Sequence, residues 1–249
     1  STEKAMEYFK IAMEKGCDTA IGNYALLCEK TQNYKDAIKY FKQAAKTGKP
    51  QCYINIGGYY MNGYGVPIDT NKAIKYFKKA ASKGCSVGSF NLGLMYETGK
   101  GVPVNYKLAL QFYQQGEALG DINCIHNIAV MYNEGKGVEA NKEEAFRYFK
   151  MAADLGSVSD CANTGSRYHY GVGTKVDLIQ AEHYYKIAIE KGSNEAMFLY
   201  SLILSKGAEG IPQNVKEATR LLKQAADNGL PAAIQQYNEL VHNSEKKTG

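Results

Sequence analysis

The sequence predicts an all-α protein, a right-handed superhelical solenoid of antiparallel helix pairs. A repeated unit, a capping residue at the same place in every copy and a glycine that closes each copy together predict this fold. The segment AIKYFKKAASKG from Ala73 recurs as AFRYFKMAADLG from Ala145, and the leading alanines of seven copies are separated by 32, 36, 36, 36, 36 and 37 residues. Such a period indicates a stacked array rather than a domain around a single core.

Each copy of this segment is expected to form one helix, which we name helix B. In the copy from Ala73, the residues Tyr76, Phe77 and Ala80 complete one apolar helical stripe. Four residues before each leading alanine stands a side chain that can accept hydrogen bonds from the free amides of the helix start. These caps are Ser1, Asn33, Asp69, Asn105, Asn141, Asp177 and Asn214, and the closing glycines are Gly48, Gly84, Gly120, Gly156, Gly192 and Gly229.

A second helical stretch, helix A, follows each closing glycine. GSFNLGLMYETG is one example, with Leu92, Gly93 and Tyr96 at helical spacing. A glycine inside a helix costs about 1 kcal/mol relative to alanine. We therefore expect Gly57, Gly93 and Gly165 to allow close approach of a neighbouring helix.

The repeat frame predicts one array over residues 1–241. It opens with a helix B at 1–16 and continues with repeats at about 17–48, 49–84, 85–120, 121–156, 157–192 and 193–229. A polar capping helix is expected at about 230–242, followed by a mobile tail at 243–249. Because the first helix B has no helix A before it, we expect that the array was cut from a longer one.

The full pattern is A-x-x-x-LG-x-x-Y-x-x-G-x-GV-x-x-(N/D)-x-x-x-A-x-x-(Y/F)-(Y/F)-x-x-A-A-x-x-G. It resembles the Sel1-like repeat, a relative of the tetratricopeptide repeat, over almost the whole chain. Residues 17–48 depart from it because they lack the Gly-x-Gly-Val loop, and the unit around Gly207 and Gly210 carries one extra residue. The resemblance implies a concave groove, lined by A helices, that binds peptide segments of other proteins.

An asparagine column along the A helices is the first candidate binding feature. It stands before the Leu/Ile-Gly pair, or its equivalent, in five successive units. Because an amide both donates and accepts, these side chains could bond a peptide backbone at regular intervals. The alternative is that each asparagine side chain makes a contact between two helices of its own repeat. The column consists of Asn23, Asn55, Asn91, Asn127 and Asn163.

Four residues farther along the same face, Tyr59, Met95, Met131 and Arg167 are further candidate groove residues. Methionines suit grooves that accept partners of differing shape, although core packing is the favoured interpretation for both methionines. The unit SDCANTGSRYHYGVG is the most irregular, and we expect Arg167 and Tyr170 to specialise it for a partner because both residue types are common in binding hot spots.

The Gly-x-Gly-Val string at 99–102 could indicate a phosphate-binding loop. Such a loop leads from a strand into a helix and is followed by a Lys-Ser/Thr pair. Here the string joins two predicted helices and that pair is absent. We interpret it as a joint in which Gly99 and Gly101 adopt backbone angles that other residues resist, Val102 packs beneath, and Asn105 caps the next helix.

The net charge of +5 is uneven, because residues 1–84 carry +7 and residues 85–249 carry −2. Solubility is the favoured explanation for the excess lysines, with an acidic partner or nucleic acid as the alternative. The sequence contains no run of about 18 apolar residues, which a membrane-spanning helix would need. The six cysteines form no zinc-binding spacing, which favours reduced thiols and a cytoplasmic protein.

No catalytic residue, metal or cofactor is predicted. The four histidines lie in different units, and His126 occupies a slot that holds Tyr, Phe or Ile elsewhere, which favours packing. Some cysteine-rich members of the family that this chain resembles are penicillin-binding hydrolases, but their regular cysteine pairing is absent here.

The two leading hypotheses are an adaptor that gathers protein partners and a regulatory or substrate-recruiting module of a larger protein. We expect protein or peptide partners, no nucleic acid, and self-association through the open N-terminal end as a further option.

Overall fold

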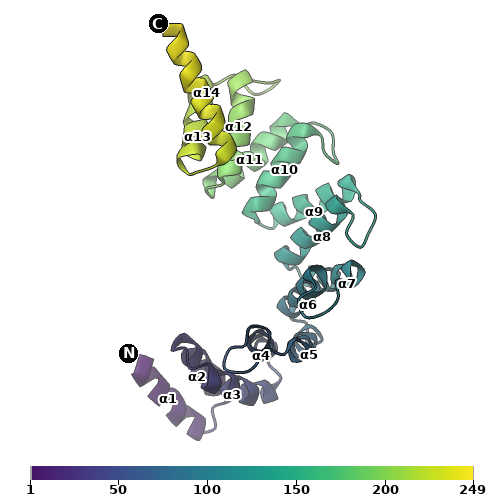
Figure 1. Cartoon of the computed structure of the whole chain (residues 1–249), viewed down its shortest axis with the longest axis vertical. Helices are drawn as coiled ribbons and strands as arrows, with labels where there is room; N and C mark the ends of the chain where they lie inside the picture. Colours follow the sequence, from purple (N-terminus) through teal and green to yellow (C-terminus); the bar gives the residue numbers. More distant parts are fainter. Residues whose placement is uncertain (1, 249) are drawn as a thin grey trace. The chain divides into compact units, whose positions relative to one another are not determined.

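The computed structural model describes residues 2–248, and side chains over residues 2–242. Within this part the chain forms fourteen α-helices, which follow one another as helix pairs (Figure 1). The all-α prediction is confirmed. The chain divides into two compact units, unit 1 at Ser1–Cys124 and unit 2 at Ile125–Gly249, with the boundary inside one helix. A single array over residues 1–241 stays a prediction.

Unit 1 alternates between the predicted B and A helices. The A helices are α2 (Asp18–Lys30), α4 (Pro50–Asn62) and α6 (Ser86–Thr98). The B helices are α1 (Thr2–Glu14), α3 (Tyr34–Ala44, followed by a 3-10 turn at Ala45–Thr47), α5 (Thr70–Ala81) and α7 (Tyr106–Glu117).

Unit 2 continues the same alternation. Its A helices are α8 (Ile122–Glu134, which begins just before the boundary), α10 (Val158–Tyr170), α12 (Asn194–Lys206) and α14 (Pro231–Thr248). Its B helices are α9 (Lys142–Asp154), α11 (Leu178–Glu190) and α13 (Val215–Asp227).

The predicted capping residues begin the B helices α3, α5, α7, α9, α11 and α13. In each case the side chain accepts a hydrogen bond from the backbone N–H three residues later, which satisfies one of the free amides of the helix start. These caps are Asn33, Asp69, Asn105, Asn141, Asp177 and Asn214. Ser1, the seventh predicted cap, lies outside the described residues.

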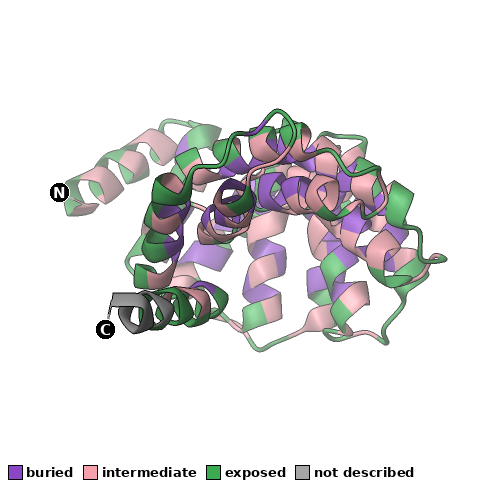
Figure 2. Ribbon diagram, turned by 90° about the horizontal axis from the view of Figure 1, so that it is seen from above, coloured by how far each residue is buried: buried purple, intermediate pink, exposed green. Residues whose placement is uncertain are grey.

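Aromatic rings hold helix A against helix B in the same way in successive pairs. In unit 1, the rings of Tyr60 and Tyr76 stack at 5.9 Å with a 9° angle between their planes. In unit 2, Tyr132 and Tyr148 stack at 5.7 Å and 11°. The buried residues of each unit lie along the helix faces that meet (Figure 2). Each unit therefore has a core of its own, made of the predicted apolar stripes.

The glycines inside the A helices mark close contacts, as predicted. A Cβ atom at Gly165 of α10 would lie 2.7 Å from the Tyr185 ring of α11, which is closer than a carbon atom can approach without displacement. The predicted contacts at Gly57 and Gly93 are likewise made with Phe77 and Tyr113. Small size at these positions sets the spacing within a helix pair.

The Gly-x-Gly-Val string joins two helices, as predicted. Between α6 and α7, Gly101 has a φ of +79°, Val102 packs against the core, and the Asn105 N–H donates to the Tyr96 carbonyl at 2.8 Å. The sequence did not indicate a further contact, in which Gly101 lies directly against Thr70 at the start of α5 in the preceding repeat. The joint therefore also connects neighbouring repeats.

The C-terminal helix differs from its expected length. We expected it to end near residue 242, whereas α14 runs from Pro231 to Thr248. The prediction of a mobile tail at 243–249 falls on residues whose side chains lie outside the described part. Gln235, Asn238 and Glu239 are exposed on α14, as expected of a polar cap, but Ile234 and Leu240 are exposed as well.

Candidate functional site

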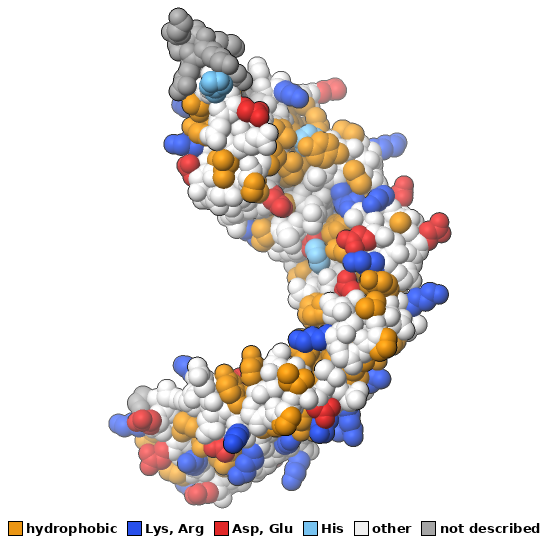
Figure 3. Space-filling model, viewed as in Figure 1, with side chains coloured by type: hydrophobic (Ala, Val, Ile, Leu, Met, Phe, Trp, Pro, Cys, Tyr) orange, Lys and Arg blue, Asp and Glu red, His pale blue; other side chains and the backbone are white. Residues whose placement is uncertain are grey.

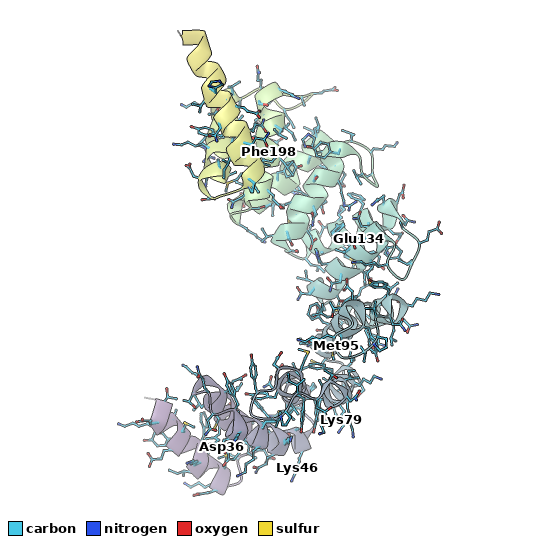
Figure 4. The ribbon with its side chains drawn as sticks, in the orientation of Figure 1. Asp36, Lys46, Lys79, Met95, Glu134 and Phe198 are labelled. Atoms are coloured by element: carbon cyan, nitrogen blue, oxygen red, sulfur yellow. The ribbon has the colours of Figure 1, made fainter. Side chains whose placement is uncertain are left out.

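In unit 1, the A helices α4 and α6 form an open pocket of about 470 Å³. Four of its residues, Asn91, Leu94, Met95 and Thr98, follow the spacing i, i+3, i+4, i+7 and so lie on one face of α6. Met61 of α4 and Lys100 of the joint complete the lining, which is mostly apolar. Hydrophobic side chains are visible on this upper side of unit 1 in Figure 3, and Figure 4 labels Met95 there. The pocket thus contains two of the predicted groove residues.

The asparagine column makes hydrogen bonds within its own helices. Asn91 Nδ2 donates to the Val87 carbonyl at 2.8 Å, and Asn55 Oδ1 accepts from Gln51 at 3.1 Å. Asn163 Nδ2 lies 3.4 Å from Asp160 of the same helix. These three hydrogen bonds each stay within one helix. Peptide binding by the column and contact between helices both stay predictions. Asn55, Asn91, Asn127 and Asn163 are all half-buried.

Three of the predicted groove residues, Tyr59, Met95 and Met131, lie in the core. Tyr59 is 2% exposed, and its ring contacts Phe41 and Tyr34. Burial raises the pKa of the Tyr59 hydroxyl above its ordinary value. Met131 is fully buried. We assign Tyr59 and Met131 to packing, and we correct the prediction that they line a groove. Met95 is also 2% exposed, although it borders the pocket between α4 and α6. Core packing was the favoured interpretation for both methionines.

In unit 2, the A helices α10, α12 and α14 border a pocket of about 290 Å³. Tyr170, which is 54% exposed, lines it as the sequence suggested. The other lining residues include His169, Leu202, Ile203, Lys206 and Gln236. Of these, Leu202 and Lys206 of α12 were not singled out from the sequence. A second pocket of about 240 Å³, between α12, α13 and α14, shares Ser205 and Gln236 with the first.

Arg167 is the most unusual side chain of α10, because it occupies a position where other repeats carry Leu, Tyr, Met or Ile. Its Nη2 donates to Asn133 Oδ1 at 2.9 Å, and its guanidinium carbon lies 4.5 Å from the centre of the Phe149 ring. Burial lowers the pKa of the guanidinium. Its Nη1 atom is buried and has no hydrogen-bond partner among the described residues. Because this donor is buried, it is not accessible to a partner in this arrangement of the side chain.

A buried carboxylate lies near Arg167 in the chain and was not singled out from the sequence. Asp160 is fully buried, and His126 Nδ1 lies 2.8 Å from its Oδ1. Ser157 Oγ donates to the other oxygen at 2.5 Å. The His126 ring also meets Phe149 edge-on at 5.8 Å, in agreement with the packing role that we expected.

This cluster does not have the geometry of an activated nucleophile. In such a site the histidine contacts the hydroxyl that it deprotonates, whereas here Asp160 stands between His126 and Ser157. Over the part of the chain that the structure describes, no three His, Cys, Asp or Glu side chains are arranged to hold a metal ion. Within that same part no helix combines the length and apolarity needed to cross a membrane.

A family model for the Sel1 repeat matches the chain seven times, at residues 1–17, 21–48, 50–85, 86–121, 122–157, 159–193 and 194–230. The chain belongs to the Sel1 repeat family. Sel1 repeat proteins generally mediate protein–protein interactions, and the family typically provides non-enzymatic scaffolds. A search of the curated proteins finds no significant match.

Solved structures show the same fold. A Sel1 repeat protein from Oxalobacter formigenes is 29% identical with a TM-score of 0.76, over 90% of this chain and 95% of that one. The protective antigen c5321 of uropathogenic Escherichia coli, which displays an SLR fold, is 24% identical with a TM-score of 0.77 over 98% of this chain. This chain spans 61% of that antigen. A chain of the APC/C hetero-tetramer Cut9–Hcn1 is similar in fold, with 16% identity and a TM-score of 0.51, over 96% of this chain and 46% of that one.

Proposed function

We propose that this Sel1 repeat protein is a scaffold or adaptor that binds segments of partner proteins along the A helices. The pocket between α4 and α6 supports this proposal most directly. It presents Leu94, which is 39% exposed, and the side chains of Asn91 and Thr98 on one helix face. An apolar surface with a few polar groups is typical of a site that anchors one side chain and fixes the direction of its backbone.

The polar groups of the pocket fit a peptide rather than a purely apolar ligand. Because Asn91 donates one N–H to its own helix, its amide oxygen faces no donor among the described residues and can accept from a backbone N–H. Lys100 at the edge can pair with an acidic side chain or a carbonyl oxygen. In unit 2, the exposed ring of Tyr170 offers a further anchor.

A photo-crosslinking experiment tests the proposal in unit 1. The photoreactive amino acid p-benzoylphenylalanine replaces Thr98, which lies in the pocket, or Gln114, an exposed residue of the B helix α7. We expect irradiation in cells to join defined partner proteins to the Thr98 position and not to the Gln114 position. Equal capture at both positions, or none at Thr98, would contradict the groove.

Substitutions then test whether the captured partner depends on the pocket. Leu94→Asp places a charge on the apolar floor, and the matched control Leu119→Asp makes the same change at another exposed leucine of unit 1. We expect Leu94→Asp to weaken partner binding at least about tenfold, or about 1.4 kcal/mol, while Leu119→Asp has little effect. Both positions are partly exposed, so the fold should tolerate either change.

The alternative, a regulatory or substrate-recruiting module of a larger protein, uses the same surface. Immunoblotting of the native polypeptide with an antibody against unit 2 separates the two, because a module would migrate well above 27.5 kDa. Catalysis has no part in the proposal. A hydrolase of the penicillin-binding type would need an activated nucleophile, and His126 instead contacts Asp160.

The compartment and self-association are smaller parts of the proposal. No disulfide joins the six cysteines, all of which lie in the described part of the chain, and a reducing cytoplasm would keep them in this state. On α1, Tyr8 is 71% exposed and Ile11 41% exposed. We include contact between copies through these side chains in the proposal, and sedimentation of a Tyr8→Ser, Ile11→Ser variant against the unchanged chain tests it.

A further inference from the structure

The B helices α3 and α5 of unit 1 concentrate the positive charge of the chain. Counted from the capping residue to the closing glycine, the segments of α3 and α5 (residues 33–48 and 69–84) hold nine lysines and two aspartates, a net charge of +7. The corresponding segments of the other five B helices together carry no net charge. All nine lysines are exposed. We name the surface that they form the lysine face. It consists of Lys35, Lys39, Lys42, Lys46, Lys72, Lys75, Lys78, Lys79 and Lys83.

These lysines are not neutralised in the way that the cations of unit 2 are. In unit 2, B-helix cations pair with acids three or four residues away, as in Lys150–Asp154 at 2.7 Å and Arg220–Glu217 at 2.6 Å. On the lysine face, the described residues form one ion pair, Lys72–Asp69 at 2.8 Å. The remaining eight ammonium groups therefore repel one another, and an acidic ligand would relieve that repulsion.

Tyrosine rings bring the two rows of lysines together. Lys42 of α3 donates to the Tyr60 hydroxyl at 2.9 Å, and its Nζ lies 5.1 Å from the centre of that ring. Lys72 of α5 lies 5.2 Å from the same ring. Figure 3 shows the blue side chains on the lower side of unit 1, and Figure 4 labels Lys46 and Lys79 there, away from Met95. The lysine face is therefore separate from the proposed groove.

A shallow depression of about 620 Å³ follows α3 on this surface. Four lysines border it, with Ile38 and Val66 among the lining residues. From Lys35 to Lys46 the helix rises about 16 Å, a distance that about five residues of an extended chain cover. The depression therefore has the length of a short linear segment with acidic side chains and one apolar side chain that would contact the half-buried Val66.

Two other anionic partners fit this face less well. Single-stranded nucleic acid needs a series of exposed aromatic rings on which successive bases stack. Tyr60 is 8% exposed and stacks on Tyr76, and Tyr64, which is exposed beside the depression, already stacks on Tyr34. Membrane-binding helices combine lysines with exposed large apolar side chains, whereas Ile38 of α3 and Phe77 of α5 are buried. Neither helix carries an arginine, the residue best suited to bidentate phosphate contacts.

We propose that the lysine face of α3 and α5 docks an acidic, extended segment of a partner protein, independently of the groove on the A helices. A labelled twelve-residue peptide of alternating Glu and Asp with one central Leu is the probe, and fluorescence anisotropy measures its binding. A peptide with Gln and Asn in place of the acids, a twelve-nucleotide single-stranded DNA and vesicles with 30% phosphatidylserine are the comparisons.

The decisive variant is Lys35→Glu, Lys39→Glu, Lys46→Glu, which reverses three charges beside the depression. Its matched control is Lys175→Glu, Lys216→Glu, Lys223→Glu, which changes the net charge equally at exposed lysines of unit 2. We expect the first to weaken peptide binding at least about tenfold and the control to change it less than about twofold. Replacing the first three lysines with Arg should preserve binding, because the charge is kept.

Three outcomes would overturn the proposal. One is equal weakening by the two charge-reversed variants, since binding would then follow net charge alone. Another is tighter binding of the DNA or the vesicles than of the acidic peptide. The third is equal binding of the neutral and acidic peptides at 50 mM salt, where electrostatic attraction is weakly screened. Circular dichroism confirms that each variant keeps its helical content before binding is compared.

Discussion

A Cβ atom at Gly57 of α4 would lie 2.5 Å from Cε1 of Phe77 in α5. The neighbouring Gly58 faces no atom within 4 Å outside its own helix. Two adjacent glycines of one helix therefore have different physical roles. One sets the distance between the helices of a pair, and the other only lowers the helix propensity of α4.

We predict opposite effects of alanine at these two positions. Gly58→Ala should stabilise the protein by up to about 1 kcal/mol, because alanine is the better helix former. Gly57→Ala gains the same propensity but forces the Phe77 ring to move, at a cost of about 1–3 kcal/mol for overpacking, so it should be clearly the less stable variant. Urea unfolding followed by circular dichroism compares them. A Gly57→Ala variant as stable as Gly58→Ala would show that the pair can separate without cost.

Removing a cap should destabilise its helix. Asn105 Oδ1 accepts from the Leu108 N–H at 3.0 Å, and Asn105→Ala leaves this amide without its side-chain partner. We expect a loss of about 1 kcal/mol. The control is Asn71→Ala in the first turn of α5, where the cap is Asp69 and the exposed asparagine can be replaced with little effect. Thermal unfolding compares the stability of the two variants. Equal midpoint temperatures for Asn105→Ala and Asn71→Ala would contradict a capping role for Asn105.

The stability of unit 2 should depend on His169 at acidic pH. Burial, and secondarily the charge of Lys206, lower the pKa of His169 below its ordinary value. The unfolded chain therefore takes up the proton first as the pH falls, so this contribution to stability is present above about 6.5 and is lost as the pH decreases through that value. Below the pKa that His169 has in the folded protein, its contribution to the free energy of unfolding no longer changes with pH.

His169→Phe should remove this part of the pH dependence, while His183→Phe, at an exposed position of α11, should keep it. Urea unfolding at pH 7.5, 6.5 and 5.5 measures the slope for the three proteins. The assignment fails if the unchanged protein and His169→Phe lose stability in parallel. The phenylalanine ring keeps an aromatic side chain beside Tyr170, which stacks on His169 at 4.2 Å.

The cysteines should react with iodoacetamide in a defined order. A hydrogen bond with Thr19 lowers the pKa of the exposed Cys17, so more of its thiol is ionised at a given pH. Burial raises the pKa of the buried cysteines and also blocks access, so they should react only after unfolding. Mass spectrometry of the digested protein follows each site, and fast labelling of a buried site under native conditions would contradict the structure. The protected set is Cys28, Cys52, Cys124 and Cys161.

The helix frame was predictable because its signals are local. A cap such as Asn105 bonds an amide three residues away, and a closing glycine such as Gly120 adopts a φ of +76°. These effects need no distant partner, so they can be read from residue type and spacing. The aromatic positions were predictable for the same reason, since their spacing places them on one helix face.

The candidate site was only partly predictable. Asn91 and Tyr170 border pockets, whereas Tyr59, Met95 and Met131 are buried, with Met95 at the bottom of the pocket between α4 and α6. The helical period tells which residues share a face, but it does not tell how deeply that face is covered by the next repeat. Coverage depends on the neighbouring side chains, which differ from copy to copy.

By itself the sequence determined the all-α architecture, the repeat boundaries, the capped helix starts and the uneven charge, because each follows from local spacing and composition. Only the tertiary structure decided which side chains meet across repeats. His126 and Asp160, like Asn133 and Arg167, are 34 residues apart in the chain and become hydrogen-bonded partners when one repeat stacks on the next. Stacking also buries Tyr59 and leaves Leu94 at the surface, since the fit between neighbouring helix faces sets exposure.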